Sequence, residues 1–264
     1  MPACAPSGPT SSDVTTDEVP VGIDPPCWEV PGWRARFGLV AGISGRGSEV
    51  APFDLGLWTQ RPVGEVMTNW RRLRAALPGF PGQVLAHQVH GGRVLWQPGR
   101  DGWTLHEGAD GHATDSPGLL LLVTVADCVP VYLAAPESGM IALLHAGWRG
   151  TAAGILAAGV RLLCERAGVA PPEVVMHAGV AISGARYEVG AEVPDALGIP
   201  RAGAGPWHVD LRGVLADQAR ALGVGEVTVS GHCTAEPGSP FFSHRASGGT
   251  DGRMVAWLGR PAAA

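Results

Sequence analysis

The residues most capable of chemistry in this chain begin with His145. An apolar run ends at this histidine and passes into a glycine-bracketed turn, Ala146-Gly147-Trp148-Arg149-Gly150, ahead of a predicted helix. A side chain that binds a metal or transfers a proton would lie here beside free backbone N–H groups and an arginine, which suits a phosphate or another anion. We therefore expect Arg149, with the backbone from Gly147 to Gly150, to bind phosphate.

Two further residues, His90 and Cys128, occupy similar places at the end or in the middle of hydrophobic, strand-like runs. Imidazole and thiolate are good ligands for a borderline-soft divalent metal, and three protein ligands leave one position open for water or substrate. Alternatively, Cys128 is a nucleophile that a histidine base activates, or a buried structural cysteine. The spacing of His90, Cys128 and His145 leaves these alternatives open.

The composition favours small-molecule chemistry. The chain has 264 residues, of which 45% are hydrophobic and 16% charged, and its formal net charge is -5. These values predict a soluble globular protein, and the lack of any block of Lys or Arg argues against nucleic acid as a partner. The longest apolar stretch, residues 118–135, contains Asp127 and Pro130, which favours buried strands over a membrane span.

The cysteines predict a reducing environment. Their number is odd and they lack CxxC spacing, which indicates neither a disulfide framework nor a zinc ribbon. They are Cys4, Cys27, Cys128, Cys164 and Cys233. Reduced thiols and the lack of a signal-peptide pattern predict a cytoplasmic protein.

The expected organisation is one domain behind a tail. Residues 1–26 are rich in Pro, Ser, Thr and Asp without apolar periodicity, so we expect a disordered N-terminal tail there and a single domain over residues 27–264. Apolar runs predict strands over residues 33–42, 83–96, 119–125, 129–134, 140–145, 174–179 and 226–230, and helical periodicity predicts helices over 67–77, 151–166 and 211–222. This alternation indicates a layered fold of the α/β (α+β) class.

Alternation within the predicted strand over 83–96 indicates to which side of the strand each side chain around His90 points. Gln88 and His90 point to one side, and His87 points to the other. Gln88 is thus a candidate for orienting water or a ligand, whereas His87 is assigned to packing or solvent. Asp127 points away from Cys128 in an extended chain, so we assign it a structural hydrogen bond.

Four motifs carry a resemblance to a known family. They are Gln88-Val89-His90-Gly91, Ala126-Asp127-Cys128-Val129-Pro130-Val131, His145-Ala146-Gly147-Trp148-Arg149-Gly150, and Phe242-Ser243-His244-Arg245 with Gly252-Arg253. In this order, from about Trp33 onward, the chain resembles the laccase-domain or multicopper polyphenol oxidoreductase family. Its members are mostly described as purine nucleoside phosphorylases with adenosine deaminase activity, and some are labelled peptidoglycan editing factors.

The resemblance implies a single three-layer α/β/α domain with mixed sheets, and a zinc ion held by His90, Cys128 and His145. It also implies that phosphate cleaves adenosine, inosine or methylthioadenosine to the base and a pentose 1-phosphate, and that adenosine is deaminated. The partners expected are purine nucleosides and phosphate. The chain departs from the family pattern at His244, where Tyr is usual, and at Arg245, which stands where an Arg pair is common.

Other residues are weaker candidates. Arg46, Arg245 and Arg253 are expected to bind phosphate, ribose or purine, with ordinary surface placement as the alternative. His244 is a candidate for stacking on or bonding to the base.

Copper remains an alternative metal at the His90, Cys128 and His145 site. Nine histidines without a His-X-His pair do not fit a true multicopper oxidase, so polyphenol oxidation would be incidental. A cysteine hydrolase acting on peptidoglycan precursors and a non-catalytic binding module are the other functions considered.

Overall fold

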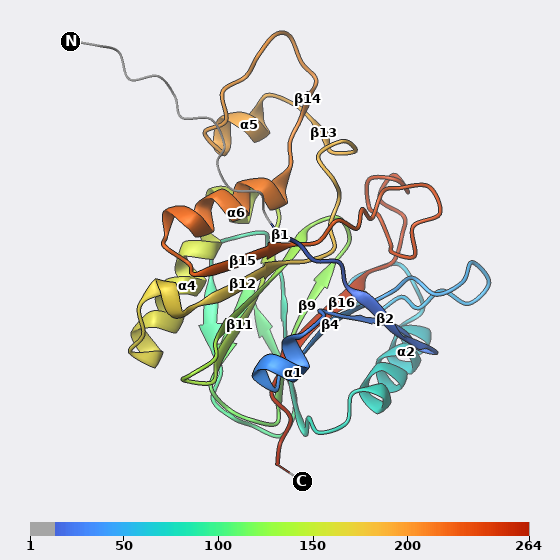
Figure 1. Cartoon of the computed structure of the whole chain (residues 1–264). Coiled ribbons are helices and arrows are strands. Elements are labelled where there is room, and N and C mark those ends of the chain that lie inside the picture. Colours follow the sequence, from blue (N-terminus) through green and yellow to red (C-terminus); the bar gives the residue numbers. More distant parts are fainter. Residues whose placement is uncertain (1–13, 264) are drawn as a thin grey trace.

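The computed structural model describes residues 14–263, and its strands form two seven-stranded mixed sheets (Figure 1). The first, here the β10 sheet, runs in the order β1 (Val14–Thr15), β15 (Glu226–Val229), β12 (Val175–Ala178), β10 (Val129–Ala135), β11 (Met140–Ala146), β8 (Gly111–Thr114) and β6 (Val94–Trp96). The second, the β9 sheet, runs β2 (Val19–Ile23), β3 (Pro26–Glu29), β4 (Val40–Ser44), β16 (Met254–Gly259), β9 (Leu119–Val125), β5 (Gly82–His87) and β7 (Gly102–Glu107).

Helices cover the outer faces of the sheets, as Figure 1 shows. Against the β10 sheet lie α4 (Ile155–Ala167) and α6 (Leu211–Ala221), and against the β9 sheet lies α2 (Val63–Ala76). Shorter elements are α1 (Trp33–Phe37), α3 (Trp148–Ala152), α5 (Glu192–Ala196), the 3-10 turn Pro171–Glu173, and the two-stranded ribbon of β13 (Glu188–Val189) and β14 (Trp207–His208). None of the helices in residues 14–263 has the length and apolarity that a transmembrane span requires.

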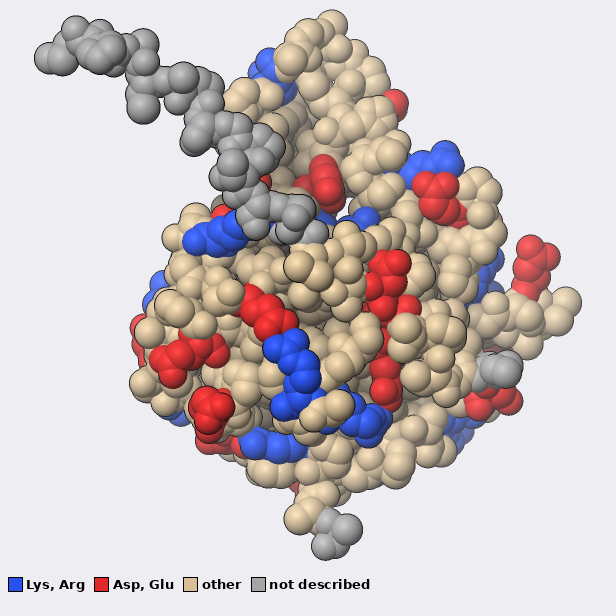
Figure 2. Space-filling model, viewed as in Figure 1, with Lys and Arg blue, Asp and Glu red and all other residues tan. Residues whose placement is uncertain are grey.

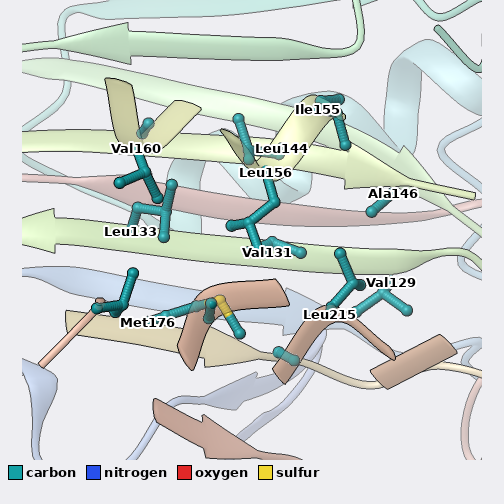
Figure 3. Packing of buried hydrophobic residues seen from close by; sticks show 14 of the residues in the cluster. Val129, Val131, Leu133, Leu144, Ala146, Ile155, Leu156, Val160, Met176 and Leu215 are labelled. Carbon is teal, nitrogen blue, oxygen red and sulfur yellow. The ribbon is translucent and has the colours of Figure 1, made fainter. Parts of the chain in front are cut away.

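The apolar core lies in three layers between these elements. Leu133 and Leu144 pack against Leu156 and Val160 of α4 in the layer that Figure 3 shows. A second layer fills the space between the two sheets, and a third joins the β9 sheet to α2. Strands β9, β10 and β11 are buried on both faces, which explains why their sequences are continuously apolar.

The α/β class with mixed sheets and helical outer layers is confirmed, and the β layer consists of two stacked sheets. Two predicted elements differ. A strand is predicted over residues 33–42, but residues 33–37 form α1, which is capped by Gly38 at a positive φ of 67° before β4 begins. The helix expected over 151–166 is divided between α3 and α4, because Gly154 adopts φ 76° at the N-cap of α4.

The prediction of a disordered tail over residues 1–26 is wrong from residue 14 onward, while residues 1–13 lie outside the described residues. Strand β1 pairs with β15 of the β10 sheet, and β2 pairs with β3 of the β9 sheet. Between them the carboxylate of Glu18 is buried and bonds to His177 Nε2 (3.1 Å), Ser230 Oγ (2.6 Å) and the Val180 N–H (3.0 Å). Partners far away in the sequence thus order this polar segment.

Candidate metal centre and its cavity

The ends of three strands bring His90, Cys128 and His145 together. His90 follows β5, Cys128 lies in the connection from β9 to β10, and His145 lies near the end of β11. Their candidate ligand atoms all lie within 4.8 Å of one another, and the two imidazole rings are 4.8 Å apart at 79°. Within residues 14–263 this is the one group of three or more His, Cys, Asp or Glu side chains placed to hold a metal.

Buried Asp110 positions the two histidines of the group. Its Oδ1 accepts hydrogen bonds from His145 Nδ1 and from the His90 N–H, both at 2.9 Å, and its Oδ2 accepts from the N–H of Gly91 (2.7 Å) and of Val89 (3.3 Å). His90 adopts a positive φ of 60°, which is costly for a residue with a side chain. The carboxylate stabilises this conformation and, by binding Nδ1 of His145, directs Nε2 of the same ring toward Cys128, where it could bind a metal.

The site favours a thiolate on Cys128. Burial raises the pKa of this thiol, but the charge of His145 and hydrogen bonds from both imidazoles outweigh burial and lower the pKa to about 6. Burial lowers the pKa of His145, but Cys128 and Asp110 outweigh it and raise the pKa to about 9. Burial likewise raises the pKa of Asp110, and the bonds from His145 and the Gly91 N–H bring it below its usual value.

The donor set and the space beside it fit a metal ion. One thiolate and two imidazoles are ligands that zinc accepts, and three protein ligands leave a position open. Gly147 borders the group, where a Cβ would lie 3.0 Å from Cys128 Sγ and 3.2 Å from His90 Cδ2. A glycine therefore preserves the room around the sulfur.

A cavity of about 440 Å³ opens beside this group, a size typical of small-molecule sites. Nine of the residues predicted for the site line it, namely Gln88, His90, Cys128, His145, Gly147, Arg149, His244, Arg245 and Arg253. Two predicted residues are not among the lining residues. The guanidinium of Arg46 lies over the ring of Phe242, and Gly150 packs against the carbonyl of Gly91, which a Cβ would approach to 2.8 Å.

Three arginines of the cavity lining have no carboxylate partner in the described chain. Arg149 lies over the ring of Trp148, 4.3 Å from its centroid, and Arg245 lies 5.2 Å from that of Tyr187. Arg253 donates to the backbone carbonyls of Asp251 and Gly252. Across residues 14–263, none of the three forms a salt bridge with a carboxylate. Such arginines are suited to an anionic ligand.

Other polar residues that line the cavity already form hydrogen bonds within the protein. The amide of Gln88 bonds only to Thr124, with its oxygen accepting from the backbone N–H (2.7 Å) and from the hydroxyl (3.0 Å), which leaves it little capacity to orient a ligand. His244 is exposed, with Nδ1 3.4 Å from a guanidinium nitrogen of Arg253. Asp127 makes structural hydrogen bonds, because it accepts from Thr234 Oγ1 and from the Arg245 N–H, but its φ of 80° is not that of an extended chain and it lines the cavity together with Cys128.

Several residues that line the cavity were not predicted from the sequence. His87 was assigned to packing or solvent, but it lines the cavity with its ring stacked on Trp58. Burial and the neighbouring Cys128 raise the pKa of Tyr187 to about 12, so its hydroxyl remains a proton donor. No local pattern singles out Asp110, because the strand that follows it, Gly-His-Ala-Thr, is short and not apolar.

The fold and the site define a class of protein, a mixed α/β structure in which strand ends gather two imidazoles and a thiol beside a cationic cavity. The family model described as multi-copper polyphenol oxidoreductase laccase matches residues 40–260, and the chain belongs to this family.

Relatives named as enzymes support this assignment. The chain is 36% identical over 249 residues to purine nucleoside phosphorylase YlmD of Geobacillus stearothermophilus, which covers 84% of this chain and 90% of that protein. It is 39% identical over 211 residues to the purine nucleoside phosphorylase of Deinococcus radiodurans, covering 76% and 78% of the two chains. The crystal structure of YlmD superimposes with a TM-score of 0.82 at 32% identity, covering 95% of this chain and all of that chain.

Proposed function

We propose that the protein is a zinc-dependent purine nucleoside phosphorylase that cleaves adenosine, inosine or methylthioadenosine with phosphate, and that also deaminates adenosine. The observation that carries the proposal is the group of His90, Cys128 and His145 beside three arginines without carboxylate partners in one cavity. The names of the relatives in Geobacillus and Deinococcus support the same reaction.

His90, Cys128 and His145 would hold the zinc ion, with Asp110 fixing the orientation of His145. When bound there, zinc would supply Lewis-acid activation of water or of a substrate oxygen. Copper is the alternative metal, since it outcompetes zinc for nitrogen and sulfur ligands where it is available. A single three-ligand group in the described chain supports one metal ion and not the several coppers of a true multicopper oxidase.

The arginines would bind and orient the phosphate. Arg149 and Arg245 lie around Tyr187 and are suited to hold two of the phosphate oxygens while the hydroxyl of Tyr187 donates to a third. An oxygen of hydrogen phosphate then forms a bond to the anomeric carbon as the bond to the base nitrogen breaks, and the leaving base takes up the proton that the phosphate loses. The arginines contribute by positioning and by neutralising charge.

A cysteine hydrolase is the second candidate, because Asp110, His145 and Cys128 form a chain like that of a thiol nucleophile, its base and the orienting acid. His90 argues against this function. A nucleophile needs one base, whereas here a second imidazole is held against the same sulfur by a backbone at positive φ. Two imidazoles converging on one thiolate favour a metal.

The test is an assay of purified wild type, Cys128→Ala and the control Cys164→Ala, whose thiol lies on α4 away from the cavity. We expect about one zinc per chain and base release that requires phosphate in wild type and in Cys164→Ala, and loss of both in Cys128→Ala. Activity that survives chelation but not thiol alkylation would support the hydrolase instead. Metal binding without turnover of any nucleoside would leave a non-catalytic binding module.

We also propose a cytoplasmic location. Cys27, Cys128, Cys164 and Cys233 all carry free thiols in the described chain, as a reducing compartment favours.

A further inference from the structure

A half-exposed tryptophan stands on the cavity wall. Trp58 lines the cavity and is 47% exposed, although a side chain of this size is usually well buried. One face of its indole stacks on His87, with ring centroids 4.6 Å apart and planes 25° from parallel. His87 is in turn held by Glu107, whose carboxylate lies 3.1 Å from Nδ1. His87 thus supports one face of the indole, while about half of the tryptophan surface stays open.

The loop that carries Trp58 is fixed by the buried carboxylate of Asp54. This carboxylate accepts from the Gly56 N–H (2.8 Å), from Thr59 Oγ1 (3.3 Å) and from the backbone N–H of Arg253 (2.8 Å). One acidic side chain therefore ties the tryptophan loop to an arginine of the cavity. The surface is ordered before any ligand arrives, which reduces the entropy cost of binding.

The contacts divide the cavity lining into two groups. Trp58, His87, Thr59 and Arg253 belong to the network around Asp54 and Glu107. The other group consists of two cation–π pairs, Arg149 with Trp148 and Arg245 with Tyr187. The second group has the charge for an anion, whereas the first offers a flat aromatic surface with a few polar groups at its edge.

We propose that Trp58, backed by His87, is the surface on which the heteroaromatic base of the nucleoside stacks. The inference rests on the proposed function and deepens it, because it assigns the base to the Trp58 group and leaves the phosphate to Arg149 and Arg245. A purine presents a large π face, and stacking on an aromatic side chain binds any base with little dependence on its substituents. Arg253 supplies donors for the acceptor atoms at the edge of the ring.

The experiment compares wild type with Trp58→Leu, Trp58→Phe and the control Trp103→Leu, a partly exposed tryptophan on β7 outside the cavity. KM is measured for inosine at saturating phosphate and for phosphate at saturating inosine. Binding of inosine and of free adenine is measured separately by calorimetry. Zinc content is determined for every variant.

We expect Trp58→Leu to raise the KM for inosine and the Kd for adenine by roughly tenfold or more, with the KM for phosphate and the zinc content unchanged. Trp58→Phe should retain most of the affinity, and Trp103→Leu should match wild type. An unchanged Kd for adenine in Trp58→Leu, or an increase confined to the KM for phosphate, would overturn the assignment.

Calorimetry separates this inference from the proposed reaction. If wild type binds adenine through Trp58 but releases no base from any nucleoside, the stacking surface stands and phosphorolysis fails. If wild type cleaves inosine and Trp58→Leu does so with the same KM, the reaction stands and the stacking surface fails. Wild type that binds neither adenine nor inosine contradicts both.

Discussion

Replacing Asp110 with asparagine tests how the candidate metal site is held together. The carboxylate accepts four hydrogen bonds, from His145 Nδ1 and from three consecutive backbone N–H groups at residues 89–91. Asparagine is nearly the same size but offers one oxygen and one NH2 group. In either orientation of the amide, two of the four N–H donors face its NH2 group and lose their acceptor.

The size of the effect follows from these lost bonds. A buried donor left without its acceptor costs about 1–3 kcal/mol, and the exposure of Val89 and His90 lets water replace part of the loss. We therefore expect Asp110→Asn to lower the free energy of unfolding by about 2–3 kcal/mol, or roughly 4–12 °C in melting temperature for a protein of this size. Zinc affinity should fall about 10- to 100-fold, as for other carboxylates that orient a metal-binding histidine.

The assay is a competition titration of the metal-free protein with a zinc chelator, together with thermal unfolding with and without zinc. Asp115→Asn is the matched control, because Asp115 is exposed and its carboxylate accepts only from the neighbouring Ser116 hydroxyl. Wild-type zinc affinity in Asp110→Asn would refute the positioning role. Equal losses in both variants would show that the effect is not specific to Asp110.

Three further substitutions probe other parts of the molecule. Gly147→Ala should weaken zinc binding by about tenfold, because the new Cβ would lie 3.0 Å from Cys128 Sγ. The fold should be retained, since the φ of -82° at this position suits alanine. Competition with a chelator measures the zinc affinity. Arg149→Gln should raise the KM for phosphate about tenfold and leave the KM for inosine unchanged in steady-state assays. Glu18→Gln should lower the melting temperature at pH 7 by the equivalent of about 1–3 kcal/mol. Burial raises the pKa of Glu18, but the hydrogen bond to His177 and the other partners outweigh burial and bring the pKa below 4.5. The stabilisation by Glu18 is therefore present above pH 4.5 and disappears as the pH falls through the lower pKa of the folded state. Melting curves at several pH values measure this loss.

Each of these changes has a control of the same chemistry. Gly64→Ala adds a methyl group where nothing lies within 4 Å, so zinc affinity should not change. Arg161→Gln removes an exposed charge on α4 and should leave both KM values unaltered. Glu137→Gln replaces an exposed acid, and its melting temperature should follow wild type at every pH. If a control changes the zinc affinity, the KM or the melting temperature as much as its test variant does, the corresponding prediction is contradicted.

Much of the fold could be predicted because its central strands are apolar on both faces. The runs that became β9, β10 and β11 predict buried strands from hydrophobicity alone, and the ends of such strands are where His90, Cys128 and His145 were sought. The structure brings these three side chains together as predicted. Their role as metal ligands stays a prediction.

Residues defined by long-range pairing could not be found in this way. Asp110 reaches His145 because Gly111 pairs with Leu144 in the β10 sheet, a register that no local pattern specifies. Strand β1 has only two residues and forms by adding to β15, a strand from a distant segment, while β2 contains Pro and Gly and pairs with the neighbouring β3. Arg46 is not among the residues that line the cavity, because its guanidinium lies over the ring of Phe242, a contact between distant segments.

The N-terminal pairing has a consequence for anyone who shortens this protein. The match to the family begins at residue 40, so a boundary chosen from it would delete β1, β2, β3 and Glu18. His177, Ser230 and the Val180 N–H would lose their shared acceptor, and both β15 and β4 would become bare edge strands. Uncovered edges are templates for pairing between molecules. A chain trimmed to residues 40–260 should therefore aggregate, and its failure in an assay would say nothing about catalysis.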